Sequence, residues 1–196
     1  MLRKSFPRII VVTGTPGVGK TTISKILAKR LQAEYISLRE LVLKYRLVLN
    51  YDRELLSWII DEDRVRRILR KSILRKQSKK IVIDTHILSV IDSDLVDIVV
   101  VLRLHPKLLL KRLKERHYPL SKIKANIQCE VMGLCTAEAV SIFSEDKVVE
   151  INTSDREIEE ALNEVVNALN NPEKYRPGKI DWSQVIFEDE LVKYLT

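Results

Sequence analysis

Glycine is scarce in this chain, which has only five glycines among 196 residues. The positions of these five glycines exclude the small GTPases, whose Asp-x-x-Gly switch needs an aspartate three residues before a glycine. No glycine of this chain has one, and no Asn-Lys-x-Asp motif for guanine recognition occurs. The sequence also lacks a glycine-rich transporter signature, and it is short for a motor or a helicase.

Cysteines and long apolar runs are also rare. The two cysteines, Cys129 and Cys135, lie six positions apart, a spacing that matches neither a redox Cys-x-x-Cys pair nor a zinc site. We therefore expect buried or unreactive thiols in a reducing, cytoplasmic compartment. No apolar run approaches the roughly 20 residues that span a bilayer, and the apolar N-terminal run is too short for a signal peptide. No membrane association is expected.

Positive charge, in contrast, is abundant. The net charge is +7 and the isoelectric point about 9.4, which favours anionic partners. Nine basic residues and no acidic residue lie between positions 64 and 80, namely Arg64, Arg66, Arg67, Arg70, Lys71, Arg75, Lys76, Lys79 and Lys80. This run is either the solvated face of a helix or an RNA-facing surface, and the sequence leaves both interpretations open.

Short apolar runs rich in β-branched residues alternate with longer helix-like stretches. The runs cover residues 8–13, 34–38, 80–85, 97–102 and 147–152. This alternation predicts βαβ units and therefore an α/β fold in three layers, with a five-stranded parallel sheet between helices.

Two helical patterns, at 38–49 and 61–77, lie between the second and third predicted strands, which is more chain than one crossover needs. Asp61 is well placed to cap the second of these helices. After the fourth strand, a basic hairpin at 116–124 should separate two helices, the second of which should run from 121 to 143.

The stretch "GTPGVGKTT" at 14–22 follows the first predicted strand and opens a helix. It contains the P-loop pattern in the strand-to-helix context that the pattern requires. Glycines let backbone N–H groups turn toward phosphate oxygens, and the helix N-terminus adds its dipole. Lys20 supplies charge to the β- and γ-phosphates, and Thr21 supplies a hydroxyl ligand to Mg²⁺. The nucleotide-binding residues predicted here are Gly14, Gly17, Val18, Gly19, Lys20, Thr21 and Thr22.

Asp84 ends the third predicted strand, at the edge where open α/β sheets bind their ligands. A carboxylate there can hold Mg²⁺ opposite Thr21. His86, two residues later, is either a structural histidine or a group that orients a water or an acceptor oxygen.

Phosphoryl transfer also needs cations that neutralise the γ-phosphate and the leaving oxygens. Arg116 in the basic hairpin is the best candidate, with Arg112, Lys122 and Lys124 as helpers. The predicted catalytic residues are Lys20, Asp84, His86 and Arg116. A P-loop followed by inserted acceptor-binding helices and a short basic lid is the layout of small-molecule kinases.

The segments "TGTPGVGKTT", "IIDEDRV", "VIDTH" and "ERHYPLSKIKANIQCEV", in this order and spacing, resemble the adenylate kinase isoenzyme 6 family over about residues 8 to 170. That family comprises archaeal and eukaryotic adenylate kinase-like ATPases that act in small-subunit ribosome assembly. The resemblance implies phosphoryl transfer from ATP to a nucleoside monophosphate, and ATP hydrolysis tied to rRNA maturation beside a platform ribosomal protein. It also implies a lid arginine at Arg116, a functional His86 in the Asp-x-His motif, and Arg156 in the adenine-side loop.

One segment departs from the adenylate kinase pattern. Where these enzymes read Gly-Asp-Leu followed by an arginine that clamps the monophosphate, this chain reads "SLRELVLKYR". Arg39 and Glu40 stand in place of the Gly-Asp pair, and Arg39, Lys44 and Arg46 are the available substitutes for the clamp. Specific AMP kinase activity is therefore left open.

The predicted organisation is a kinase domain over residues 1–170 and a C-terminal tail over 171–196 packed on the core. The monophosphate-binding insertion is expected at about 37–62 and the lid at about 115–125. The predicted function is a broad-specificity nucleoside monophosphate kinase with ATPase activity, which uses Mg²⁺ and acts in small-subunit biogenesis. The alternative is an ATP-switched assembly factor that binds a small-subunit ribosomal protein and rRNA without significant kinase activity.

Overall fold

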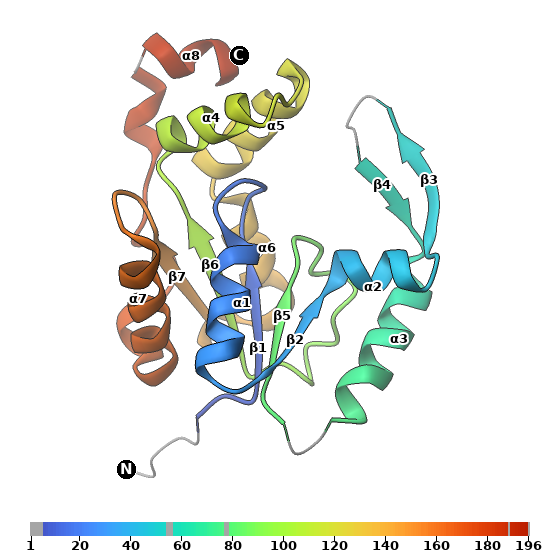
Figure 1. Ribbon diagram of the computed structural model, residues 1–196. Coiled ribbons are helices and arrows are strands. Elements are labelled where there is room, and N and C mark those ends of the chain that lie inside the picture. Colours follow the sequence, from blue (N-terminus) through green and yellow to red (C-terminus); the bar gives the residue numbers. More distant parts are fainter. Residues whose placement is uncertain (1–5, 54–56, 77–78, 188, 196) are drawn as a thin grey trace.

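The computed structural model describes residues 6–53, 57–76, 79–187 and 189–195. At its centre lies a five-stranded parallel sheet in the order β2-β5-β1-β6-β7, with helices on both faces (Figure 1). The predicted three-layer α/β fold with a five-stranded parallel sheet is therefore confirmed.

The strands of this sheet are β1 (Ile9–Thr13), β2 (Glu34–Ser37), β5 (Ile81–Asp84), β6 (Ile98–Arg103) and β7 (Val148–Asn152), and a separate antiparallel hairpin consists of β3 (Val48–Asp52) and β4 (Ser57–Ile60). The α-helices are α1 (Lys20–Arg30), α2 (Leu38–Lys44), α3 (Glu62–Leu74), α4 (Pro106–Glu115), α5 (Leu120–Val131), α6 (Leu134–Phe143), α7 (Ile158–Asn170) and α8 (Asp189–Leu195).

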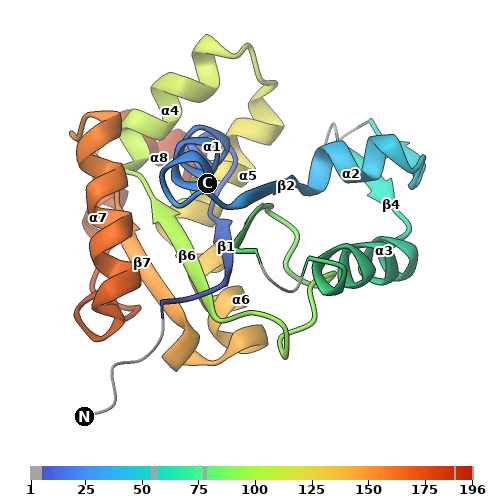
Figure 2. The ribbon, with the colours of Figure 1, turned by 60° about the horizontal axis from the view of Figure 1, so that its bottom comes forward.

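Both faces of the three central strands, β5, β1 and β6, are buried, which explains their long apolar runs in the sequence. In β1, Ile10 and Val12 pack against the layer that contains α1 and α7. Ile9 and Val11 point to the opposite layer, which contains α2, α3 and α6. Figure 2 shows α1 and α7 on one side of the sheet and α6 on the other. Successive residues of a strand therefore contribute their side chains to two separate hydrophobic cores.

All five strands end at the same edge, at the top of Figure 1. β1 is the central strand and continues there into loop 14–19 and α1. In the register of β1 with β5, Val12 lies opposite Asp84, so the end of β5 is brought beside the loop. Helices α4 and α5 stand over one part of this edge and the β3–β4 hairpin over another (Figure 1). The edge is where open α/β sheets place their ligands.

The segment after β2 corrects one prediction. The helix expected at 38–49 is α2 over its first seven residues only, and residues 48–52 and 57–60 form the hairpin. The helix ends because its apolar face stops after Val42, and Arg46 then adopts a left-handed conformation with φ 53°. The inserted segment is thus one helix and a hairpin instead of helices alone.

The helix expected at 121–143 is also wrong in part, because it is broken into α5 and α6. The break lies at Gly133, whose φ of 64° is the left-handed conformation that ends many helices. A Cβ at this position would lie 3.4 Å from Nη1 of Arg103, so the chain turns here against a buried guanidinium.

Helix α3 follows its prediction closely. The side chain of Asp61 caps it by accepting a hydrogen bond of 3.0 Å from the backbone N–H of Arg64, which confirms the predicted cap. The helix ends at Leu74, before the predicted end at residue 77, which lies outside the described residues.

The C-terminal tail packs beside α5. Leu191 and Tyr194 of α8 are buried in the same apolar cluster as residues of α4 and α5, and Val185 joins them. Figure 1 shows α8 beside α4 and α5 above the carboxyl edge of the sheet.

Candidate functional site

Loop 14–19 is held in place by close packing that only glycine permits. Gly14 and Gly17 have φ angles of 134° and 105°, in the region that favours glycine. A Cβ on Gly14 would lie 2.3 Å from the backbone oxygen of Leu102 in β6, and one on Gly17 would lie 2.8 Å from Cδ1 of Leu109 in α4. The glycines therefore let the loop lie against β6 and α4, with its path fixed before any ligand binds.

Lys20, the first residue of α1, folds back over this loop. Its Nζ donates hydrogen bonds to the backbone oxygens of Gly14, at 2.7 Å, and Thr15, at 3.1 Å. Burial lowers the pKa of Lys20, and the negative charge of Asp84 is among the groups that oppose this shift. The loop thus places an ammonium group of low solvation where a phosphate chain would be bound.

Thr21 and Asp84 form a polar pair beside the loop. The hydroxyl of Thr21 donates a 2.7 Å hydrogen bond to Oδ2 of Asp84, and the hydroxyl of Tyr35 in β2 donates to the same oxygen at 3.1 Å. Burial and the nearby carboxylate of Asp84 raise the pKa of Tyr35, so this phenol stays a donor. The role of Tyr35 was not predicted, because in the sequence it is one residue of a short, largely apolar strand.

The pair of Thr21 and Asp84 fits a hard cation. Among the described residues, no group of three or more His, Cys, Asp or Glu side chains could hold a metal alone. Mg²⁺ is commonly held by one or two protein oxygens together with substrate phosphates and water, so a threonine hydroxyl and a carboxylate are a suitable donor set.

His86 lies just beyond the end of β5, at the surface of this edge of the sheet. The surrounding protein removes part of the solvation of the imidazole and so lowers its pKa to about 4, and the positive charges of Lys20 and Lys122 add to the shift while Asp84 opposes it. The imidazole is therefore neutral at neutral pH and able to accept or donate a hydrogen bond.

The predicted lid arginine, Arg116, and its predicted helper, Arg112, differ in position. Arg112 in α4 donates from Nη1 to the loop carbonyls of Val18, at 3.2 Å, and Gly17, at 3.4 Å. Burial lowers the pKa of Arg112, and the neighbouring charge of Arg116 adds to the shift. Arg116 lies one turn later, at the C-terminal cap of α4, with an exposed side chain. The structure thus brings the predicted helper, Arg112, into contact with the loop and leaves Arg116 at the solvent-facing end of the helix.

The other predicted nucleotide-binding residues are spread over the same edge. Val18 is buried, Gly19 is half-buried at the start of α1 with φ 109°, and Thr22 is exposed on α1. Arg156 lies in the turn between β7 and α7, where its Nη1 is 3.5 Å from Oε2 of Glu164. It is therefore near the carboxyl end of β7 and paired with an acid of α7.

A buried charged network below the loop was not predicted from the sequence. Oε2 of Glu130 in α5 accepts a 2.5 Å hydrogen bond from the Thr15 hydroxyl, and its Oε1 accepts one of 2.8 Å from Nε of Arg103 in β6. Arg103 also contacts Glu150 of β7, and the side chains of all three charged residues are at most 3% exposed. The available signal was a charged residue in each of two apolar strands, Arg103 at the end of β6 and Glu150 within β7, because a buried charge needs a partner.

The tail contributes to this network. Nε1 of Trp182 donates to Oε1 of Glu130 at 3.3 Å, and the backbone N–H of Gly178 donates to Oε2 of Glu150 at 3.2 Å. Burial opposes the charge on Arg103, but the two carboxylates outweigh it and raise its pKa. The network therefore links loop 14–19, the sheet, α5 and the tail.

The inserted segment, which consists of α2 and the β3–β4 hairpin, carries cationic and aromatic side chains. The guanidinium of Arg39 in α2 lies over the ring of Trp58 in β4, with Cζ 5.2 Å from the ring centroid. Nζ of Lys44 lies 5.6 Å from the centroid of the Tyr45 ring, and Arg46 is exposed. Of the three available clamp residues, Arg39 is therefore the one placed against the hairpin.

The basic run at 64–80 divides into paired and exposed residues. Arg66 and Arg70 pair with Asp92, and Arg70 also with Asp94, while Lys76 pairs with Glu34. Three cations make no ion pair with another described residue, namely Arg67 and Lys71 of α3 and Arg75 at its C-terminal cap. Together with Arg70 and Leu74, they line a surface groove of about 440 Å³.

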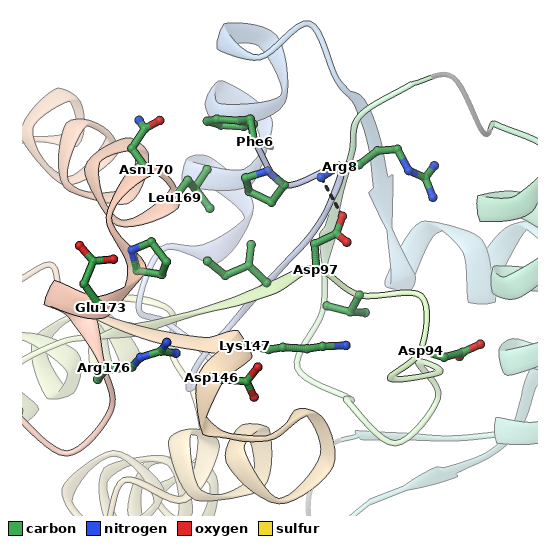
Figure 3. A pocket seen from close by; sticks show the side chains of 14 residues that line it. Phe6, Arg8, Asp94, Asp97, Asp146, Lys147, Leu169, Asn170, Glu173 and Arg176 are labelled. Carbon is green, nitrogen blue, oxygen red and sulfur yellow. Dashed lines mark hydrogen bonds between the residues drawn. The ribbon is translucent and has the colours of Figure 1, made fainter. Parts of the chain in front are cut away.

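A larger hollow lies far from this chemistry, at the amino ends of β1, β6 and β7 (Figure 3). It has a volume of about 1000 Å³ and is lined by both acids and bases. Nη1 of Arg176 is bonded to the backbone oxygen of Glu145, and Nζ of Lys147 to that of Ser93. Asp97 caps the start of β1 by accepting from the N–H of Arg8, as drawn in Figure 3. These hydrogen bonds join neighbouring segments of the chain, so the side chains have a structural role.

Comparison with known proteins identifies the family. The family described as "AAA domain" matches residues 10–133. A protein of Methanocaldococcus jannaschii named "Putative adenylate kinase" is 35% identical over 179 residues, which cover 91% of this chain and 95% of the relative. This chain belongs to an adenylate kinase-like family of P-loop proteins. Two more archaeal members carry the same name. The one from Thermococcus kodakarensis is 38% identical over 95% of this chain and 98% of its own, and one from Saccharolobus islandicus is 39% identical over 89% and 87%.

Solved structures support the fold. A shikimate kinase from Acinetobacter baumannii in complex with shikimate superposes with a TM-score of 0.57 at 18% identity, over 86% of this chain and 96% of that one. A gluconokinase from Sinorhizobium meliloti gives 0.56 at 20% identity, over 87% and 96%. The fold is thus that of P-loop kinases, and family and fold together support a nucleotide-binding phosphotransferase. Within the described part of the chain, no helix is both long and apolar enough to cross a bilayer.

Proposed function

We propose that this protein is a nucleoside monophosphate kinase of the adenylate kinase type, which converts ATP and AMP to two ADP and also hydrolyses ATP slowly. The observation that carries the proposal is the hydrogen bond between Thr21 and Asp84 beside a prefolded P-loop. The names of the archaeal relatives point to the same activity. The proposed domain limits are those predicted from the sequence, with a kinase domain to residue 170 and a tail beyond it.

The proposed nucleotide-binding groups act by position and charge. The loop N–H groups and the N-terminus of α1 bind the phosphate oxygens, and Lys20 exchanges its carbonyl partners for the β- and γ-phosphates. Thr21 and Asp84 hold Mg²⁺, which when bound neutralises phosphate charge. Because Lys20 is buried, its charge acts on the phosphates with little screening by water.

Two arginines have separate proposed roles. Arg112 holds the loop through Gly17 and Val18, and Arg116 extends from the end of the same helix to contact the transferred phosphoryl group. His86, neutral at neutral pH, orients the acceptor oxygen in kinase turnover and a water in hydrolysis. Arg156 lies on the adenine side.

On the acceptor side, Arg39 and Trp58 are the groups proposed to receive the monophosphate. The guanidinium supplies charge for the phosphate and the indole supplies an aromatic surface for the base. Arg39 and Glu40 stand where the usual Gly-Asp pair would be, so we expect broad acceptor specificity.

A product assay tests the proposal. Purified protein is incubated with Mg-ATP alone and with AMP, CMP, GMP or UMP, and the nucleotides are separated by ion-exchange chromatography. A kinase forms the diphosphate of the acceptor together with ADP, whereas hydrolysis forms ADP and inorganic phosphate. If no monophosphate is phosphorylated, the kinase assignment fails, and if ATP is also left intact, the whole proposal fails.

The second candidate function is an ATP-switched assembly factor that binds a small-subunit ribosomal protein and rRNA in the cytoplasm. It is favoured by the exposed cations Arg67, Lys71 and Arg75 on α3. Filter binding of small-subunit rRNA tests it, with ATP present and absent. Replacement of the three cations by glutamine should weaken binding and reduce its salt dependence. Unchanged binding by that variant, or binding indifferent to ATP, would count against the switch.

A further inference from the structure

The two cysteines of the chain lie side by side beneath the P-loop. Cys129 is near the end of α5 and Cys135 is near the start of α6, and the turn at Gly133 brings them together. Their sulfur atoms are 3.7 Å apart, and both residues are only partly buried. Both thiols are therefore free and partly buried, and their expected lack of reactivity stays a prediction.

Both sulfurs contact the loop that we propose binds ATP. The hydroxyl of Thr15 lies 3.9 Å from Sγ of Cys129 and 3.8 Å from Sγ of Cys135. The backbone oxygen of the same Thr15 accepts a hydrogen bond from Lys20, and its hydroxyl is bonded to Glu130, the neighbour of Cys129 in sequence. A change at the sulfurs is thus transmitted to the phosphate-binding lysine through a single residue.

The surroundings make one thiol the more reactive of the two. The hydrogen bond with Cys135 lowers the pKa of Cys129 to about 7, against the effect of burial. The same hydrogen bond, together with burial, raises the pKa of Cys135. Cys129 is therefore the thiolate that attacks an oxidant, and Cys135 is the thiol that follows.

We propose that Cys129 and Cys135 form a redox-active pair whose oxidation to a disulfide weakens nucleotide binding at the P-loop. With hydrogen peroxide as oxidant, the Cys129 thiolate attacks one peroxide oxygen, the O–O bond breaks, and a sulfenic acid and hydroxide are formed. The hydroxide takes up the proton that Cys129 released on ionisation and becomes the first water. Sγ of Cys135 then attacks the sulfenic sulfur, and the hydroxyl leaves with the Cys135 proton as a second water. Overall, two thiols and one peroxide give one disulfide and two waters.

Closing the bond must move the sulfurs beside Thr15. They are 3.7 Å apart and a disulfide holds them at about 2.05 Å, so the two side chains must rotate or α5 and α6 must approach each other. We expect this rearrangement to remove the thiol contacts of Thr15 and to disturb its hydrogen bond to Glu130. Because Thr15 sets the position of the loop and of Lys20, we expect the dissociation constant of Mg-ATP to rise about tenfold or more, the size of effect expected when one hydrogen bond to a charged group is lost.

The experiment uses the full chain and rests on the proposed function only for its binding readout. Reduced protein is treated with hydrogen peroxide, the disulfide is detected by peptide mass spectrometry under non-reducing conditions, and Mg-ATP binding is measured by calorimetry before oxidation, after it and after dithiothreitol. We expect a link between Cys129 and Cys135, weaker ATP binding, and recovery on reduction. Recovery on reduction is measured on the wild-type protein itself, and it excludes irreversible damage as the cause of the weaker binding.

Cys129→Ser is the matched control, because it removes the thiol that attacks peroxide, while a serine hydroxyl can still contact Thr15. Peroxide should leave the ATP affinity of this variant unchanged, whatever its starting value. Absence of the disulfide, oxidation of Cys129 to a sulfinic acid alone, or a disulfide that leaves ATP affinity unchanged would each overturn the inference. Failure of the reduced protein to bind ATP would instead contradict the proposed function, and the disulfide would still be tested by mass.

Discussion

Thr15, Lys20 and Asp84 are buried beside the central strands, whereas Leu49 and Tyr51 on the inserted hairpin are exposed to solvent. We call the first region, loop 14–19 with Thr21 and Asp84, the phosphate side, and the second, α2 with the β3–β4 hairpin, the acceptor side. On the phosphate side, polar groups have short, specific partners that are buried or partly buried. On the acceptor side, cations lie over aromatic rings at the surface.

The difference shows which part of the site tolerates change. A buried polar group without its partner costs free energy, so the residues of the phosphate side are tied to one another. An exposed hairpin of two strands is held by few contacts and can vary at small cost. Chemistry is therefore expected to depend on the phosphate side, and acceptor choice on the acceptor side.

The largest expected effect is on folding and comes from the phosphate side. Gly14→Ala forces a Cβ to within 2.3 Å of a backbone oxygen at a φ of 134°, and we expect a loss of about 3 to 5 kcal/mol of unfolding free energy, measured in urea. Gly178→Ala is the control, because it has a positive φ of 89° but no atom within 4 Å. It should cost only about 1 kcal/mol. Equal losses would show that packing against β6 does not fix the loop.

Lys20→Ala should give the next largest effect, on catalysis. Removal of the buried charge over the loop should lower ATP turnover at least about 100-fold, as expected for a group that stabilises transition-state charge. Steady-state rates with and without AMP measure this. Lys29→Ala, an exposed lysine on the same helix, should leave the rates unchanged. Turnover that survives in Lys20→Ala would refute the assignment of the phosphate side.

Arg39→Ala should impair the acceptor side and leave the phosphate side unaffected. Loss of the cation over Trp58 should raise the KM for the monophosphate about tenfold, while ATP hydrolysis without acceptor stays unchanged. Arg67→Ala on α3 is the control of equal charge. A parallel fall in both activities would mean that Arg39 also acts on ATP and that the two sides are not independent.

The smallest effect concerns His86 and the pH dependence of stability. Its pKa is about 4 in the folded chain and about 6.5 when unfolded. Above pH 6.5 both states are neutral and the residue contributes nothing. As the pH falls from 6.5 to 4, the unfolded chain binds the proton first, so stability decreases over this range.

We therefore expect a larger drop in the urea midpoint from pH 7.5 to pH 4.5 for the wild type than for His86→Asn. His117→Asn, an exposed histidine of the lid with a positive φ that asparagine accepts, serves as the control. An identical drop in all three proteins would show that the imidazole is freely solvated.

Much of the fold followed from local pattern. Apolar strands buried on both faces, such as residues 98–102 of β6, were predictable because polar residues do not interrupt the apolar run. The cap at Asp61 follows from residue type alone. The errors lie where a helix ended inside a longer helical pattern. At Gly133 the helical pattern continues on both sides, and the chain turns where a left-handed glycine lies against a guanidinium from β6 that is distant in sequence.

The sequence by itself determined the P-loop, the parallel sheet around it and the position of Asp84 at a strand end, because each depends on neighbouring residues or on strand order. Only the tertiary structure decided which side chains meet. It placed Tyr35 on Asp84, Arg112 instead of Arg116 on the loop, and Cys135 against Cys129. These contacts join residues from different elements, and their geometry is set by the packing of helices on the sheet, which no local pattern encodes.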